Sequence, residues 1–110
     1  MISKELLSAV FNKDVTKYDY ETQILFYRDE HDSLIWTEFN IHELAHKVKE
    51  WAIENGIVLE SSTYKSKAVC HTGARTHNNE IYYPEIFNAP TEPEAVFKAG
   101  QWVLDNKDNK

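Results

Sequence analysis

An amphipathic segment over residues 41–55, with a start signal and a stop signal, constrains the fold of this chain most strongly. Asn40 is followed by Glu43 at the third helical position, as in a capping box, and Gly56 stands just past the last apolar position. At helical spacing the apolar side chains share one face: Ile41, Leu44, Ala45, Val48, Trp51 and Ala52. This pattern predicts one well-bounded helix with a buried side.

Two further helices are expected at the ends of the chain. Ser3 can cap a short helix whose apolar side chains, Leu6, Leu7, Val10 and Phe11, fall on one face. Thr91 and Glu94 repeat the capping-box pattern and open a helix that continues to about Asn106.

The remaining runs are β-prone. Residues 23–28 and 34–39, separated by a polar turn, predict a β-hairpin, and residues 57–64, 67–72 and 80–87 predict three more strands. The expected order is α-β-β-α-β-β-β-α, which predicts an α+β fold with a mostly antiparallel sheet and helices packed on it.

Length and charge narrow the possible functions. The 110 residues, of which 42% are hydrophobic, suit a single domain over residues 1–106, with residues 107–110 as a frayed polar tail. The net charge of −6 disfavours direct binding to nucleic acid or to an anionic membrane. Residues 1–40 hold eight acidic and four basic side chains, so the negative charge is concentrated near the N-terminus.

The single cysteine and the absence of long apolar runs favour a cytoplasmic protein. Cys70 has no partner for an internal disulfide, and no stretch resembles a signal peptide or a membrane span of about 20 apolar residues. We expect Cys70 to be a small core residue. His71 is its neighbour on a predicted strand and points to the opposite face, so the two cannot act as a nucleophile and base.

The sharpest motif is His42-Glu43-Leu44-Ala45-His46, which matches the HExxH pattern of zinc metallopeptidases. Such a site needs two imidazoles one turn apart, a third ligand from elsewhere and the glutamate as general base. The possible third ligands in this chain are Glu50, Glu60, Cys70, His71 and His77.

Three features of the helix argue against a catalytic zinc site. Glu43 is already accounted for as the capping partner of Asn40, and Lys47 stands where longer zinc-peptidase signatures carry an uncharged residue. His42 and His46 lie about 100 to 150° from the apolar face, on a flank of the helix that we expect to be solvated. We therefore predict no metal, no cofactor and no catalytic residue, with a zinc-dependent hydrolase using His42, Glu43 and His46 as the alternative.

The last helix carries more apolar residues than one sheet can cover. Ala95, Val96, Ala99, Trp102 and Val103 form one face, and Phe97 and Leu104 widen the arc. Either the N-terminal helix packs across Phe97 and Leu104, or these two residues contact a partner or a second subunit. Internal packing is the favoured alternative, and Phe97 and Leu104 are the candidate partner-binding residues.

The helix from Ile41 to Trp51, the Gly56 stop, and the Thr91-Glu92-Pro93-Glu94-Ala95 start of the last helix with Trp102 carry a resemblance. In these segments the chain resembles small phage- or prophage-encoded proteins of unknown function with an α-β-α sandwich character. The resemblance implies an accessory protein of a mobile element, and it brings no catalytic residues.

The leading functional hypothesis is a non-enzymatic protein-binding module, an inhibitor or adaptor. Small size, acidic charge and spare apolar surface support it, and the acidic surface could imitate nucleic acid toward a nucleic-acid-binding protein. A homodimer joined through the last helix is a further possibility.

Overall fold

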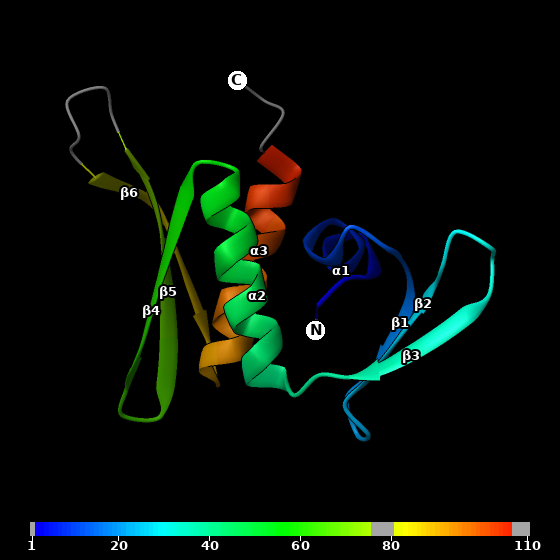
Figure 1. Ribbon diagram of the computed structural model, residues 1–110. Helices are drawn as coiled ribbons and strands as arrows, with labels where there is room; N and C mark the ends of the chain where they lie inside the picture. Colours follow the sequence, from blue (N-terminus) through cyan, green and yellow to red (C-terminus); the bar gives the residue numbers. More distant parts are fainter. Residues whose placement is uncertain (1, 76–80, 107–110) are drawn as a thin grey trace.

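The computed structural model describes residues 2–75 and 81–106 and shows an α+β fold with three helices and two antiparallel three-stranded sheets (Figure 1). In chain order the elements are α1 (Lys4–Phe11), β1 (Asp14–Asp19), β2 (Ile24–Arg28), β3 (Leu34–Glu38), α2 (Ile41–Glu54), β4 (Ile57–Tyr64), β5 (Lys67–Arg75), β6 (Ile81–Ala89) and α3 (Glu92–Asn106). The predicted tail at 107–110, the start of the predicted strand at residue 80, and His77 lie outside the described residues.

Each sheet is a meander in which neighbouring strands along the chain pair with each other. The N-terminal sheet has the order β1-β2-β3, and the C-terminal sheet has the order β4-β5-β6. The pairing of β2 with β3 is regular over five residue pairs, whereas the β1–β2 pairing shifts register between Val15 and Lys17. The β5–β6 pairing has a similar irregularity between Thr72 and Ala74.

The helices lie between the two sheets. In Figure 1, α2 and α3 cover one face of the C-terminal sheet, and α1 separates this helix pair from the N-terminal sheet. The core forms where α1, α2 and α3 meet, and its fully buried side chains include Leu6, Leu44, Val48, Val96 and Val103.

Polar side chains define where the helices begin. The backbone N–H of Leu6 donates to Ser3 Oγ at 3.0 Å, and that of Glu43 donates to Asn40 Oδ1 at 2.9 Å. Glu94 N donates to Thr91 Oγ1 at 3.4 Å. After α2, Gly56 adopts φ +82°, a left-handed conformation that glycine accepts without strain. The three predicted start signals and the predicted stop are therefore confirmed.

The α+β class is confirmed, but the predicted element order lacked one strand. The sequence does not predict β1, because three of its six residues are charged. In the structure, Val15 is the one fully buried residue of this strand. β1 is a strand because it pairs with β2 and packs beneath α1, contacts that local sequence does not encode. The strands therefore form two sheets of three.

Candidate functional site

The two faces of the N-terminal sheet have different surroundings. In an antiparallel sheet, directly opposed residues share a face and successive residues alternate between faces. Val15 and Leu25 are fully buried beneath α1, and Tyr27, opposite Val15, packs against the same core. The opposite side of this sheet, which we call the outer face, points away from the helices (Figure 1).

The outer face carries an apolar strip of four side chains: Ile24 and Phe26 from β2, and Leu34 and Trp36 from β3. Phe26 lies directly opposite Trp36. Leu34 is 54% exposed and Trp36 is 61% exposed, while Ile24 and Phe26 are half-buried. The strip is a contiguous apolar surface in contact with solvent.

Other exposed large apolar side chains among the described residues are scattered. Ile53 lies on α2, Tyr64 at the end of β4, and Ile86 on β6. The cross-strand neighbour of Ile86 is the polar His71. Single exposed apolar residues are common on protein surfaces, whereas a contiguous patch indicates an interaction site. The apolar strip is thus the best candidate site.

Both cations of the N-terminal sheet are already engaged within it. Lys17 is opposite Phe26, and its Nζ lies 5.1 Å from the centre of the Phe26 ring, a cation–π contact. Arg28 Nη1 donates to the carbonyl oxygen of Asp32 at 3.1 Å, and Arg28 Nε lies 3.8 Å from the Asp32 carboxylate. Among the described residues, Asp32 is the one carboxylate within ion-pair distance of either cation.

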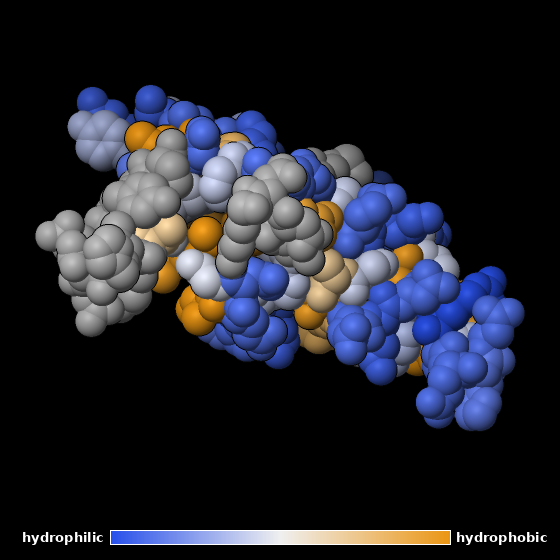
Figure 2. Space-filling view, turned by 90° about the horizontal axis from the view of Figure 1, so that it is seen from above, coloured by the Kyte–Doolittle hydropathy of each residue, from blue (hydrophilic) through white to orange (hydrophobic). Residues whose placement is uncertain are grey.

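The N-terminal sheet carries most of the negative charge of the chain. From Asp14 to Glu38 there are seven acidic and two basic side chains, a net charge of −5 against −6 for all 110 residues. Within the described part of the chain, Asp14, Glu21 and Glu38 form no ion pair. Hydrophilic side chains cover the end of the molecule formed by the turn between β2 and β3 (Figure 2).

Local hydrogen bonds hold the other end of the sheet in place. Asp19 Oδ1 accepts from the backbone N–H groups of Glu21 and Thr22 at 3.0 and 3.4 Å, and these bonds lower the pKa of Asp19. The Tyr18 hydroxyl donates to the carbonyl oxygen of Phe39 at 2.5 Å, and partial burial raises the pKa of Tyr18. These bonds fix the turn after β1 and join β1 to the segment that follows β3.

The HExxH segment lies at the start of α2, with His42, Glu43 and His46 on a solvated side of the helix and Leu44 and Ala45 buried. The Glu43 carboxylate accepts from Asn40 Nδ2 at 2.6 Å, and Glu43 N donates to Asn40 Oδ1, so Glu43 pairs with the N-cap residue through a side-chain bond and a backbone N–H. The His46 side chain is 73% exposed, and its Nε2 lies 2.7 Å from Glu50 Oε1. His42 and His46 line a shallow groove of about 200 Å³ against α3.

The described residues contain no group of three or more side chains that could hold a metal ion. Cys70 is fully buried on the inner face of the C-terminal sheet, which confirms its predicted place in the core, and burial raises its pKa to about 11. Glu60 and His71 oppose each other on the other face of that sheet. Of the possible third ligands, Glu50 contacts a histidine of the motif, as the ion-pair partner of His46.

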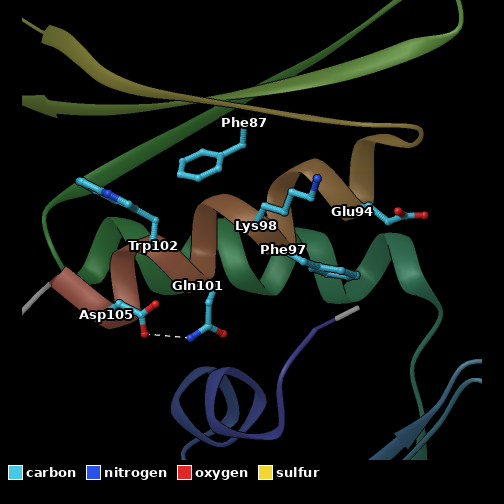
Figure 3. Close-up of a pocket in the computed structure, with 7 residues that line it drawn as sticks. All are labelled: Phe87, Glu94, Phe97, Lys98, Gln101, Trp102 and Asp105. Carbon is cyan, nitrogen blue, oxygen red and sulfur yellow. Dashed lines mark hydrogen bonds between the residues drawn. The ribbon is translucent and has the colours of Figure 1, made fainter.

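A second groove, of about 420 Å³, runs along α3 beside β6 (Figure 3). Phe87 projects from β6 toward α3, and Trp102 of α3 also lines the groove. Its polar side chains bind within the protein: Lys98 Nζ donates to the carbonyl oxygen of Asn88 at 2.8 Å, and Gln101 accepts from the Ser3 hydroxyl at 2.6 Å. The groove therefore combines aromatic surface with polar side chains, of which Lys98 and Gln101 are bonded within the protein.

The two predicted partner-binding residues lie on this helix. Phe97 is only 3% exposed, and Leu104 is half-buried against the core. Packing of α1 against α3 is consistent with the predicted internal alternative. A partner role for Phe97 and Leu104 stays a prediction, although little of Phe97 is available to contact another protein.

Comparison of the chain with protein-family models, with curated proteins and with solved structures gave no match in any of the three. Among the described residues, no helix has the length and apolar character needed to cross a bilayer.

Proposed function

We propose that this chain is a non-enzymatic protein-binding module, an inhibitor or adaptor, that contacts its partner through the outer face of the N-terminal sheet. The observation that carries the proposal is the exposure of Trp36 and Leu34 side by side with Phe26 on one face. Tryptophan is enriched among the residues that dominate binding energy at interfaces. Burial of the strip by a partner would remove this apolar surface from water.

The charge of the same sheet indicates which kind of protein it binds. A net charge of −5 between Asp14 and Glu38 attracts a basic surface, speeds encounter with it and repels acidic proteins. A second copy of this chain would bring the same negative charge to the interface. We therefore propose a basic protein as the partner, which includes a nucleic-acid-binding protein whose basic surface this sheet would occupy.

The biological setting in this proposal is the cytoplasm, with the chain as an accessory product of a phage or prophage. The lone, buried Cys70 suits a reducing compartment. Genes neighbouring the coding sequence test the mobile-element origin: phage genes on both sides would support it, and a stable chromosomal operon would contradict it.

A matched pair of surface variants tests the binding face. We expect Leu34→Ser combined with Trp36→Ser to abolish recovery of a basic protein from lysate, because both exposed anchors are lost. Ile86→Ser is the control, since Ile86 is 56% exposed on the outer face of the other sheet. Quantitative mass spectrometry of proteins recovered on each variant measures the result.

Two results would contradict the proposal. One is equal recovery of the same protein by the wild-type chain and the Leu34→Ser, Trp36→Ser variant. The other is loss of recovery in Ile86→Ser alone. Circular dichroism of each variant establishes that a lost partner does not reflect a lost fold.

A further inference from the structure

We propose that the partner binds as an extended, cationic segment that adds to the open edge of β3 as a fourth strand of the N-terminal sheet. This inference rests on the proposed function and specifies the mode of binding and the chemistry of the bound segment. Strand addition obtains affinity from backbone hydrogen bonds and specificity from alternate side chains.

The hydrogen-bond phase of the β2–β3 pair determines which groups face the open edge. Phe39 N donates to the carbonyl oxygen of Gln23 at 2.9 Å, and Asp29 N donates to that of Ser33 at 3.0 Å. Bonded pairs alternate with non-bonded pairs in an antiparallel ladder, so the odd-numbered residues of β3 bond to β2. The backbone N–H and C=O groups of Leu34, Trp36 and Glu38 consequently point away from the sheet.

The same three residues place their side chains on the outer face, because Trp36 opposes Phe26 there. A strand bonded to the backbone at Leu34 and Trp36 therefore also lays alternate side chains beside the apolar strip. The edge of β3 thus offers both free backbone groups and apolar side chains to the same added strand. Glu38 adds a carboxylate at the end of that edge.

β3 lacks lysine, proline and a bulge, three of the features that commonly protect a sheet edge. Natural edge strands carry lysine, proline or a bulge that blocks further pairing. β3 has the sequence Leu-Ile-Trp-Thr-Glu and pairs with β2 without irregularity. The opposite edge, β1, has a register shift between Val15 and Lys17 and packs beside α1.

The edges of the C-terminal sheet fit a partner strand less well. β6 contains Pro84, which lacks the N–H that a new ladder needs. β4 has the polar run Glu60, Ser61, Ser62 and Thr63, so a strand added there would bury little apolar surface. β3 is the edge that combines free backbone groups with exposed apolar side chains.

Charge selects a cationic strand over a second copy of β3. Two N-terminal sheets joined edge to edge would place net charges of −5 next to each other. The net negative charge of the N-terminal sheet attracts a segment that carries lysine or arginine. Where these residues alternate with apolar ones, the apolar side chains share the outer face with Trp36 and the cations lie on the opposite face. This alternation follows from the two-residue period of a strand.

Titration with designed peptides tests the inference. The probe is a peptide of about ten residues, a common strand length, that alternates lysine with valine. The controls are the same peptide with glutamate for lysine, and a lysine–valine peptide with proline at every third position, which cannot form a ladder. We expect only the first peptide to bind, to bind more weakly as salt is added, and to slow hydrogen exchange at the amides of Leu34, Trp36 and Glu38.

Two variants of one residue separate backbone pairing from side-chain contact. Leu34→Ala and Leu34→Pro both remove the leucine side chain, but only proline removes the outward N–H. We expect the dissociation constant of the lysine–valine peptide to be about threefold to tenfold higher for L34P than for L34A, the effect of one lost hydrogen bond. The β2–β3 ladder is preserved in both variants because residue 34 is not bonded to β2.

Equal affinity of L34P and L34A, or binding of the proline-containing peptide, would overturn strand addition. Preferential binding of the glutamate peptide, or no binding of the lysine–valine peptide, would overturn the cationic segment. Without peptide, exchange of the β3 edge amides that becomes slower as the protein concentration rises would show that a second copy of the chain pairs with this edge instead. The recovery experiment with Leu34→Ser and Trp36→Ser tests the binding face whatever these peptides do. Failure of strand addition is therefore distinguishable from failure of the proposed function.

Discussion

At the scale of single residues, short polar side chains determine where elements begin and turn. Ser3 and Asn40 satisfy N–H groups that a helix leaves unbonded in its first turn, and Asp19 does the same for the turn after β1. These bonds are local in sequence, which explains why the helix starts could be predicted. The exposure of Trp36 depends instead on which side of its sheet α1 covers.

The Asp19 turn predicts a pH-dependent contribution to stability. Its hydrogen bonds from Glu21 N and Thr22 N lower the pKa of the folded state below the ordinary value of 3.8. The stabilisation is therefore complete above that value and is lost as the pH falls through the lowered pKa. We expect Asp19→Ala to unfold at lower urea concentration than the wild type at pH 7, with the difference shrinking in acid. A difference that stays constant from pH 7 to pH 2 would contradict this role.

Burial of Cys70 predicts a thiol that does not react in the folded protein. Its pKa of about 11 leaves almost no thiolate at pH 7, and the side chain is fully buried. We expect no labelling by iodoacetamide under native conditions and complete labelling in concentrated guanidinium. Rapid native labelling, measured by mass spectrometry, would place Cys70 outside the core.

At the scale of elements, the orientation of α2 determines how its HExxH segment is interpreted. The side bearing Leu44 and Val48 is fully buried against the other helices, and the side bearing His42 and His46 faces solvent. The periodicity of the sequence predicted this orientation. The strand β1 could not be predicted in the same way, because its charged residues are held in a strand by pairing with β2 and by contact with α1.

Substitutions on the two sides of α2 should differ sharply in cost. Leu44→Ala should lower the free energy of unfolding by about 2–5 kcal/mol, as is usual for a buried leucine. His46→Ala should change it by about 0.5 kcal/mol or less, because its ion pair with Glu50 is solvated. Urea unfolding with and without zinc measures both. If zinc raises the free energy of unfolding and His46→Ala removes this increase, the result would support the zinc-dependent hydrolase.

The crossing of α2 and α3 depends on Gly100. A Cβ atom added there would lie 2.5 Å from Val48 Cγ1 and 3.2 Å from Leu6 Cδ2. Gly100→Ala gains up to about 1 kcal/mol of helix propensity, but overpacking costs about 1–3 kcal/mol, so we expect a net loss of stability.

The double variant Gly100→Ala, Val48→Ala is the control for this steric explanation. Removing the valine methyl groups makes room for the new Cβ atom, so the double variant should be more stable than the sum of the two single effects predicts. Strictly additive effects in urea unfolding would show that the loss in Gly100→Ala has another cause.

At the scale of the whole molecule, the helices separate two sheets with different properties (Figure 1). The N-terminal sheet carries a net charge of −5 and an exposed apolar strip, while the C-terminal sheet supports α2 and α3. The sequence located the acidic excess in residues 1–40. It indicated Phe97 and Leu104 as partner-binding residues instead, because local sequence does not show which apolar side chains another element covers. The folded structure distinguishes them: Phe97 is 3% exposed and Trp36 is 61% exposed.

Site-specific photo-crosslinking in cells tests whether the outer face of the N-terminal sheet binds the partner. A photoreactive phenylalanine analogue is placed at position 36, 86 or 104, replacing Trp36, Ile86 or Leu104 in the full chain. We expect a crosslink to a basic protein from position 36 and none to that protein from positions 86 and 104. A partner captured from position 104 or 86 but not from position 36 would show that the binding face lies elsewhere.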